Sequence, residues 1–159
     1  MDNAEIIKKF YVSFQNKDWE GMQQCYHDNV QFSDPVFPNL HNKEAKAMWH
    51  MLVAASSGLT VTFSNIQATS HSGSCHWEAV YRFSKTGRMV HNKIEANFTF
   101  RDGLITEHQD HFDLWKWGRM ALGLPGMLFG WAPFMKNRIQ RMANRNLAHF
   151  MDKNPIYNS

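Results

Sequence analysis

The periodicity of apolar residues in this chain changes once, near Leu59, and that change limits the folds open to it. Before Leu59, apolar residues recur every three to four positions, as on the buried side of amphipathic helices. After it, apolar and polar residues alternate through four runs, 59–69, 75–84, 89–101 and 104–113. Helices followed by a strand meander predict an α+β domain, with helices packed on one face of an antiparallel sheet.

Three helices and one short strand are expected before the meander. Asn3 caps the first helix, and Asp18 caps a second with Trp19, Met22, Cys25 and Tyr26 on one face. Val30 and Phe32 form a short strand that Asp34-Pro35 ends. The third helix carries its apolar stripe on Ala45, Met48, Trp49, Leu52 and Val53.

Length and composition predict one globular domain. The 159 residues are 43% hydrophobic and 19% charged, which excludes a disordered chain. We expect a main domain over 1–117 and a helical segment over 118–159 that forms a lid or a dimer extension of it. Two cysteines, Cys25 and Cys75, are too few for a disulfide framework, and no signal peptide is recognised, so a cytoplasmic protein is expected.

The positive charge belongs to the C-terminal segment. Residues 1–113 carry ten Lys and Arg against thirteen Asp and Glu, whereas 114–159 carry seven against Asp152 alone. A nucleic-acid-binding protein would be expected to spread basic residues over a folded face, so this distribution argues against nucleic acid as a partner.

Asp110 is the most informative single residue. In the run 104–113, it lies on the same face as Leu104, His108 and Phe112, which is the face that points to the core. A carboxylate there is costly unless it is paired or lines a cavity. Asp110 is therefore either a general base in an apolar pocket or a structural carboxylate held by Tyr81, His108 or a helix N-terminus.

Two further residues are candidates for catalysis. His108 lies two positions from Asp110, roughly 6.5–7 Å along the strand, too far for a direct bond through backbone geometry alone, but both can reach one ligand. It is a catalytic residue or a satisfied core histidine. Asp34 is a second base or the cap of an Asx turn. Alternation places Glu107 and His111 on the opposite face, so no metal site is expected.

The order of these motifs resembles a known superfamily. Phe32-Ser33-Asp34-Pro35 after two helices, with Gln109-Asp110-His111-Phe112-Asp113 in the last strand, is similar to the SnoaL-like branch of the nuclear-transport-factor-2-like superfamily. The resemblance covers roughly residues 3–117. It implies a cone-shaped curved sheet wrapped by helices, an apolar pocket, and a homodimer formed through the outer sheet face.

The resemblance carries over site residues unevenly. The general-base aspartate of ketosteroid isomerase matches Asp34, but the neutral acid of that enzyme matches Ala96, which departs from its pattern. The last-strand aspartate of limonene-epoxide hydrolase matches Asp110. The arginine of its Arg-x-Asp pair has no match near His76-Trp77-Glu78.

The alternating aromatic residues of the meander indicate a pocket wall or an ordinary core. The candidates for contact with a ligand are Trp77, Tyr81, Phe98 and Phe112, and the cone implied by the resemblance favours the pocket. Asn92, on the same face, is a donor to a ligand carbonyl or a partner of Asp110.

The C-terminal segment has two parts. Residues 120–135 are uncharged but too short and too rich in Gly and Pro to span a bilayer. A helix is expected from Lys136, with an apolar side formed by Met135, Ile139, Met142, Leu147 and Phe150 and a basic stripe formed by Arg138, Arg141 and Arg145. A packed lid or dimer element is favoured over a membrane-surface contact.

These observations predict a SnoaL-like protein that binds a small, mostly apolar molecule and needs no cofactor. The enzyme hypothesis is an isomerase, cyclase or hydrolase with Asp110 as base, His108 orienting or donating, and Asp34 as the alternative base. The competing hypothesis is a ligand-binding or dimeric interaction module without catalysis.

Overall fold

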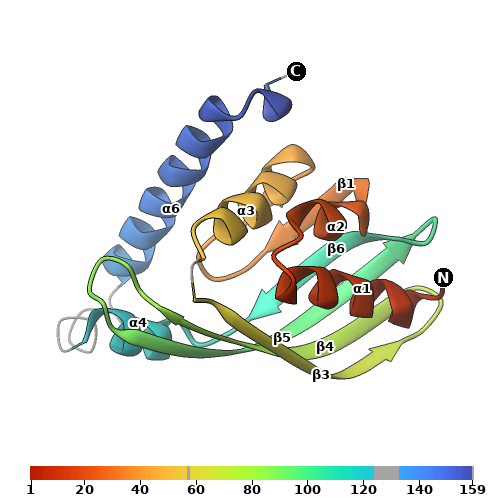
Figure 1. Ribbon diagram of the computed structural model, residues 1–159, viewed down its shortest axis with the longest axis horizontal. Coiled ribbons are helices and arrows are strands. Elements are labelled where there is room, and N and C mark those ends of the chain that lie inside the picture. Colours follow the sequence, from red (N-terminus) through yellow and green to blue (C-terminus); the bar gives the residue numbers. More distant parts are fainter. Residues whose placement is uncertain (57, 124–132, 159) are drawn as a thin grey trace.

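A computed structural model describes residues 1–56, 58–123 and 133–158. Helices come first, strands follow, and helices end the chain (Figure 1). The elements in order are α1 (Asn3–Gln15), α2 (Trp19–Gln24), β1 (Tyr26–Ser33), β2 (Leu40–His41), α3 (Lys43–Ala54), β3 (Thr60–Ala68), β4 (Ser72–Arg82), β5 (Met89–Arg101), β6 (Leu104–His111), α4 (Leu114–Leu122), α6 (Pro133–Lys153) and the short 3-10 helix η1 (Pro155–Tyr157).

The N-terminal helices begin at acidic caps. Asp2, and not Asn3 as predicted, caps α1: its carboxylate accepts from the Glu5 N–H, and the Glu5 side chain accepts from the Asp2 N–H. Asp18 caps α2 as expected. The second helix is shorter than predicted, because it ends at Gln24 and Tyr26 already starts β1.

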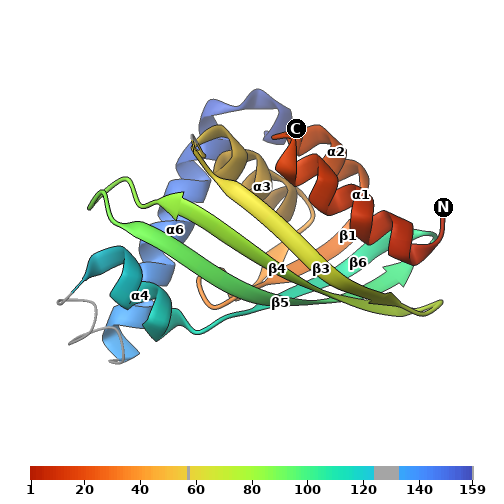
Figure 2. The ribbon, with the colours of Figure 1, turned by 60° about the horizontal axis from the view of Figure 1, so that its bottom comes forward.

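The six strands form one curved, unclosed sheet in the order β2-β1-β6-β5-β4-β3. Neighbouring strands are antiparallel except for β1 and β6, which run parallel. The predicted α+β cone is confirmed, with this one parallel pairing added to the antiparallel sheet. Figure 2 shows α1, α2 and α3 together on one face of the long, twisted strands.

Strand alternation separates the two faces of the sheet as predicted. Along β5, every second residue from Val90 to Phe100 is buried or partly buried, and the residues between them are exposed. The outer face of β4 and β5 is polar: His76 hydrogen-bonds to Glu78 and Glu95, and His91 hydrogen-bonds to Glu78. The core therefore lies between the inner sheet face and the helices.

The C-terminal segment packs beside the domain. Asp113 caps α4 by accepting from the Lys116 N–H, so the predicted run to 113 ends as a strand at His111. Helix α6 packs against α3 through the buried Leu147 and its neighbours (Figure 1). Met142, predicted on the apolar side, is 40% exposed.

Most of the uncharged stretch 120–135 lies outside the described residues. Within the described ranges, no helix has the length and hydropathy needed to cross a bilayer.

Candidate active site

A cavity of about 390 Å³, partly open to solvent, lies between the inner sheet face and α3. Its lining is mostly apolar, with two carboxylates in it, Asp34 from the end of β1 and Asp110 from β6. Strand β4 contributes Trp77 and Tyr81, and β5 contributes Asn92. The cone is therefore hollow where the sequence predicts a pocket, and both candidate bases line the hollow.

Asp110 is almost entirely enclosed, with 4% of its surface exposed. Its Oδ1 accepts two hydrogen bonds, one from the indole N–H of Trp77 at 3.2 Å and one from Nε2 of His108 at 2.9 Å. No donor among the described residues contacts Oδ2. One oxygen of the carboxylate is thus held by the protein, while the side chain lines the cavity.

His108 is the partner of Asp110 among the alternatives that the sequence leaves open, and the two bond directly although backbone geometry alone places them too far apart. Their backbones lie two positions apart on one face of β6, but the imidazole bends along the strand and reaches the carboxylate directly. Tyr81, also considered as a partner of Asp110, instead accepts from the indole N–H of Trp117 at 2.7 Å.

Behind His108, a chain of hydrogen bonds extends away from the cavity. The Tyr26 hydroxyl lies 2.7 Å from Nδ1 of His108 and accepts the indole N–H of Trp49 at 2.7 Å. An indole N–H only donates, so the Tyr26 hydrogen is left for Nδ1. This assigns the imidazole hydrogen to Nε2, which donates to Asp110. Every link then has one donor and one acceptor.

Aromatic rings fix the plane of the His108 imidazole. The ring stacks on Trp49 at 15° between planes, and the edges of Phe10 and Phe32 meet it at 80° and 90°. His108 has no exposed surface and does not line the cavity. It can orient Asp110 but cannot touch a ligand in this arrangement.

Asp34 forms the predicted Asx turn and also lines the cavity. Its Oδ1 accepts from the backbone N–H groups of Val36 and Phe37 at 2.7 and 2.6 Å, which is an Asx turn. The same carboxyl group lines the cavity. Burial, reinforced by the nearby Asp110 carboxylate, raises the pKa of Asp34 to about 7, despite the opposing effect of the two backbone donors.

The remaining predicted ligand contacts divide into two groups. Trp77, Tyr81, Asn92 and Phe112 line the cavity. Phe98 lies outside the lining, packed against His108 and Tyr11 in the core. Asn92 lines the cavity, and among the described residues it makes no hydrogen bond to Asp110, the partner predicted as an alternative.

Tyr26 and Trp49 belong to the candidate site, although the sequence analysis does not single them out. The apolar spacing places both on buried helix faces, but each has a polar group that must be satisfied when buried. The burial of a Tyr and a Trp near a buried His was the available signal, but nothing in the spacing joined the three.

Tyr11, on α1, is a fully buried tyrosine whose hydroxyl, unlike that of Tyr26, has no hydrogen-bond partner among the described residues. Burial, with a smaller contribution from the nearby Asp110, raises its pKa well above the ordinary value. Its hydroxyl therefore stays neutral and takes no part in the hydrogen-bond chain.

The described side chains contain no group of three or more His, Cys, Asp or Glu that could hold a metal ion. The arrangement that is present, an apolar cavity with two carboxyl groups in different environments, is suited to moving protons on a bound organic molecule.

Comparison with known proteins agrees with this architecture. A family model described as a SnoaL-like domain matches residues 7–108. No curated protein sequence matches the chain.

Solved structures share the fold at low sequence identity. An LEH-like epoxide hydrolase from M. tuberculosis is 17% identical, with a TM-score of 0.63 over 80% of this chain and 96% of its own. A putative polyketide cyclase from Xanthomonas campestris pv. campestris is 19% identical, with a TM-score of 0.62 over 74% and 96%. An NTF2-like protein of unknown function from Burkholderia pseudomallei is 14% identical, with a TM-score of 0.66 over 77% and 99%.

The hydrogen-bond chain behind Asp110 predicts opposite outcomes for two buried tyrosines. Tyr26→Phe leaves the Trp49 N–H and Nδ1 of His108 without partners, and should lower the free energy of unfolding by about 2–4 kcal/mol. Tyr11→Phe removes a hydroxyl that has no partner among the described residues. It should change the free energy of unfolding by less than about 0.5 kcal/mol or raise it. Urea denaturation of both variants measures the difference. Equal losses would contradict the assigned chain.

The raised pKa of Asp34 predicts a stability that depends on pH. Below about pH 4 the carboxyl is protonated in both states, whereas between pH 4 and 7 the unfolded chain releases the proton and the folded protein keeps it. The free energy of unfolding of the wild type should therefore fall by about 2–4 kcal/mol over that window, relative to Asp34→Asn.

In Asp34→Asn, the amide oxygen can still accept from the two backbone N–H groups, so the turn is preserved and other titrating groups cancel in the comparison. Denaturation at a series of pH values gives the difference between the free energies of unfolding of the wild type and Asp34→Asn as a function of pH. A flat curve would show that Asp34 ionises normally in the folded protein.

Proposed function

The chain belongs to the SnoaL-like domain family, and we propose that it is a cofactor-independent enzyme that moves a proton on a small, mostly apolar carbonyl compound. In this proposal Asp110 is the general base and Asp34, in its neutral form, is the general acid. The reaction class is that of an isomerase or cyclase.

The observation that carries the proposal is the pair of carboxyl groups in one apolar cavity. Asp110 accepts two ring N–H bonds, an arrangement suited to a carboxylate, whereas Asp34 has its pKa raised to about 7 by burial. Two carboxyl groups whose environments differ in this way can serve as base and acid at the same pH.

The proposed step balances without any added reagent. Asp110 takes a proton from the carbon beside the carbonyl, and the C–H electron pair becomes the C=C bond of an enol. Asp34 gives its proton to the carbonyl oxygen. Collapse of the enol returns that proton to Asp34. In an isomerase, the enol electron pair moves along a conjugated C=C bond, and a different carbon takes the proton held by Asp110. In a cyclase, the enol carbon bonds to a second carbonyl carbon of the same substrate, the π pair of that carbonyl moves to its oxygen, and this oxygen takes the proton held by Asp110.

Two neutral side chains in the lining support the substrate oxygen in this proposal. Asn92 can donate its amide N–H into the cavity. The Tyr81 hydroxyl accepts from Trp117, so its own hydrogen remains available as a donor. Trp77, Phe112 and the apolar residues of α3 then exclude water around the reacting carbon.

His108 acts through Asp110 and is a positioning residue. Its Nε2–H fixes the direction of the carboxylate, and the stacked rings around it prevent rotation. The chain back to Tyr26 and Trp49 keeps the hydrogen on Nε2. A carboxylate held in one orientation loses less entropy when it meets the substrate.

Two relatives in the comparison support acid–base chemistry in a cavity of this fold. One is described as a putative polyketide cyclase and another as an LEH-like epoxide hydrolase. The pairing of Asp110 with His108 and Trp77, and the nearly neutral pKa of Asp34, favour proton transfer at carbon for this chain.

Isotope exchange tests the proposal without knowledge of the natural substrate. Tetralone and cyclohexenone incubated with the protein in deuterium oxide should gain deuterium beside the carbonyl, measured by mass spectrometry. Asp110→Asn should slow this incorporation by about 10²–10⁴-fold, because an amide cannot accept the carbon proton. The melting temperature of the variant should remain close to that of the wild type, since the amide oxygen can still accept the two ring N–H bonds.

Four results would contradict the proposal. Incorporation that is unchanged in Asp110→Asn would remove the base, and a large loss of melting temperature would make the carboxylate structural. Binding of these ketones without any deuterium gain, while epoxides take up heavy oxygen from labelled water, would move the chain to hydrolysis. Binding with neither isotope would identify a ligand-binding module.

The acid role of Asp34 predicts the pH dependence of the same exchange reaction. Since the neutral form donates, the rate should fall as the pH rises through about 7, where Asp34 loses its proton. In Asp34→Asn the rate should be lower and this fall should disappear, because the amide does not titrate. A fall that persists in Asp34→Asn belongs to another group.

A further inference from the structure

One end of the molecule carries an unusual concentration of positive charge. Three segments meet there: the end of β4 with the turn that follows it (82–88), α4, and the first two thirds of α6 (133–146). Figures 1 and 2 both show these segments together, with the N-terminus at the opposite end. They hold nine of the seventeen Lys and Arg of the chain: Arg82, Lys85, Arg88, Lys116, Arg119, Lys136, Arg138, Arg141 and Arg145.

Contacts between the segments fix them as one surface. The Arg88 side chain donates to the carbonyl of Met120 in α4, and the Thr86 hydroxyl donates to the carbonyl of Ala121. On the other side, the Lys85 ammonium group contacts the sulfur of Met142 in α6. The turn therefore touches both helices, and their charges belong to one face, which we call the cationic end.

The cationic end contains no acidic counterpart. No Asp or Glu occurs within 82–88, 114–122 or 133–146, and Asp113, which directly precedes α4, is used as the cap of that helix. Arg138, Arg141 and Arg145 are exposed and pair with no carboxylate among the described residues. Their spacing places them on the side of α6 opposite Ala143 and Leu147, which face the domain. Charge left unneutralised on one face is a signature of an anionic partner.

This surface borders the opening of the cavity. The exposed members of the cavity lining mark where it meets solvent: Leu52 and Ala55 at the end of α3, Arg82 and Ser84 after β4, and Asn146 in α6. Two of the three segments that bear the positive charge thus border the opening directly, and α4 contributes Trp117 to the wall.

Apolar side chains are exposed among the charges. Met89 is 53% exposed beside Arg88, and Met142 is 40% exposed beside Arg141. Trp115 is partly exposed in α4, with the guanidinium of Arg119 4.3 Å above its ring. Cations interspersed with Trp and Met side chains match the headgroup region of a membrane, where both kinds of contact are satisfied at one depth.

We propose that the cationic end docks on an anionic lipid bilayer, with the cavity opening turned toward the membrane surface. The attachment is peripheral and mainly electrostatic, because the apolar side of α6 is engaged with α3. Entry of an apolar molecule from the bilayer into the cavity rests on the proposed function, whereas the docking itself does not.

Vesicle sedimentation of the full chain tests the docking. Vesicles of phosphatidylcholine with roughly one third phosphatidylglycerol should bind the protein at low salt, and vesicles of phosphatidylcholine alone should not. Salt that shortens the screening length to about 10 Å or less should release it. Combining Arg138→Gln, Arg141→Gln and Arg145→Gln should weaken binding on the order of 100-fold.

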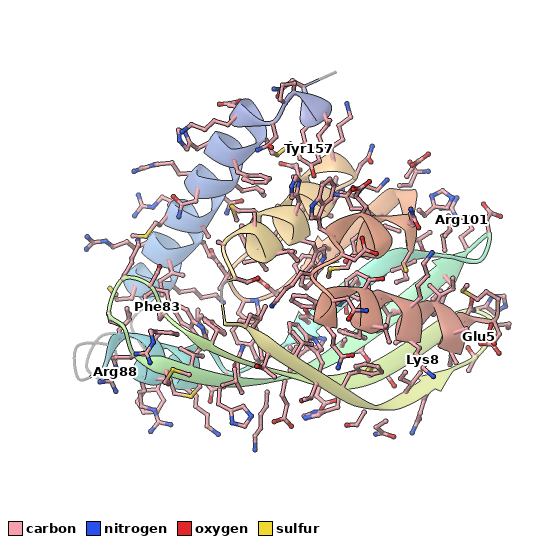
Figure 3. The ribbon with its side chains drawn as sticks, in the orientation of Figure 1. Glu5, Lys8, Phe83, Arg88, Arg101 and Tyr157 are labelled. Atoms are coloured by element: carbon pink, nitrogen blue, oxygen red, sulfur yellow. The ribbon has the colours of Figure 1, made fainter. Side chains whose placement is uncertain are left out.

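A charge-matched variant serves as the control. Lys8→Gln, Arg101→Gln and Lys153→Gln together remove the same charge from exposed positions away from the cationic end, Lys153 being in the last turn of α6 (Figure 1). This variant should leave vesicle binding within about twofold of the wild type. Figure 3 shows Lys8 and Arg101 at the end opposite Phe83 and Arg88.

The proposal fails if the two triple variants lose binding equally, because attraction would then follow net charge and not this surface. It also fails if the wild type does not bind anionic vesicles at low salt. Tighter binding to a duplex oligonucleotide than to the vesicles, again lost only in the α6 variant, would identify nucleic acid as the partner and overturn the membrane assignment. Loss of docking with ketone exchange intact would leave the proposed function standing.

Discussion

The cavity depends on how one buried carboxylate is satisfied. An ionised Asp taken out of water loses several kcal/mol of hydration, which must be offset by donors that are themselves fixed. Asp110 meets this requirement with two aromatic ring N–H groups, from Trp77 and His108, that also pack as apolar surface. The donors therefore stabilise the carboxylate without bringing a positive charge or water into the cone.

Because His108 donates to Asp110, the buried imidazole needs a hydrogen-bond partner of its own deeper in the protein. Once His108 donates through Nε2, its Nδ1 needs a donor, which is the Tyr26 hydroxyl, and that hydroxyl is in turn satisfied by Trp49. The chain links β6, β1 and α3, the elements that enclose the cavity. Orientation of the candidate base and docking of α3 on the sheet are thus maintained by the same few bonds.

The fold and part of the site could be predicted from the sequence, because they follow from local side-chain periodicity. Alternation in β5 and β6 places Asp110 and His108 on the inner face, because side-chain direction in a strand is a local property. The sequence names His108 as one of several possible partners of Asp110 but cannot select among them, since the bond depends on a side-chain rotation. The apolar spacing of α2 continues to Tyr26 and predicts a helix there, whereas pairing with β6 draws Tyr26 into β1. The pKa of Asp34 could not be predicted, because it depends on burial in the folded protein and on Asp110, which lies far away in the sequence.

The segment after β6 contributes part of the cavity. The solved structures are covered almost completely, whereas only 74–80% of this chain is covered. Residues after β6 provide the Trp117 that engages Tyr81, and the α6 side chains Ala143 and Asn146 in the cavity lining. Tyr157 holds this segment against the helices, because its hydroxyl hydrogen-bonds to His50 of α3 and to Gln23 of α2. Because α3 also encloses the cavity, the packing of α6 on α3 keeps Asn146 at the edge of the opening.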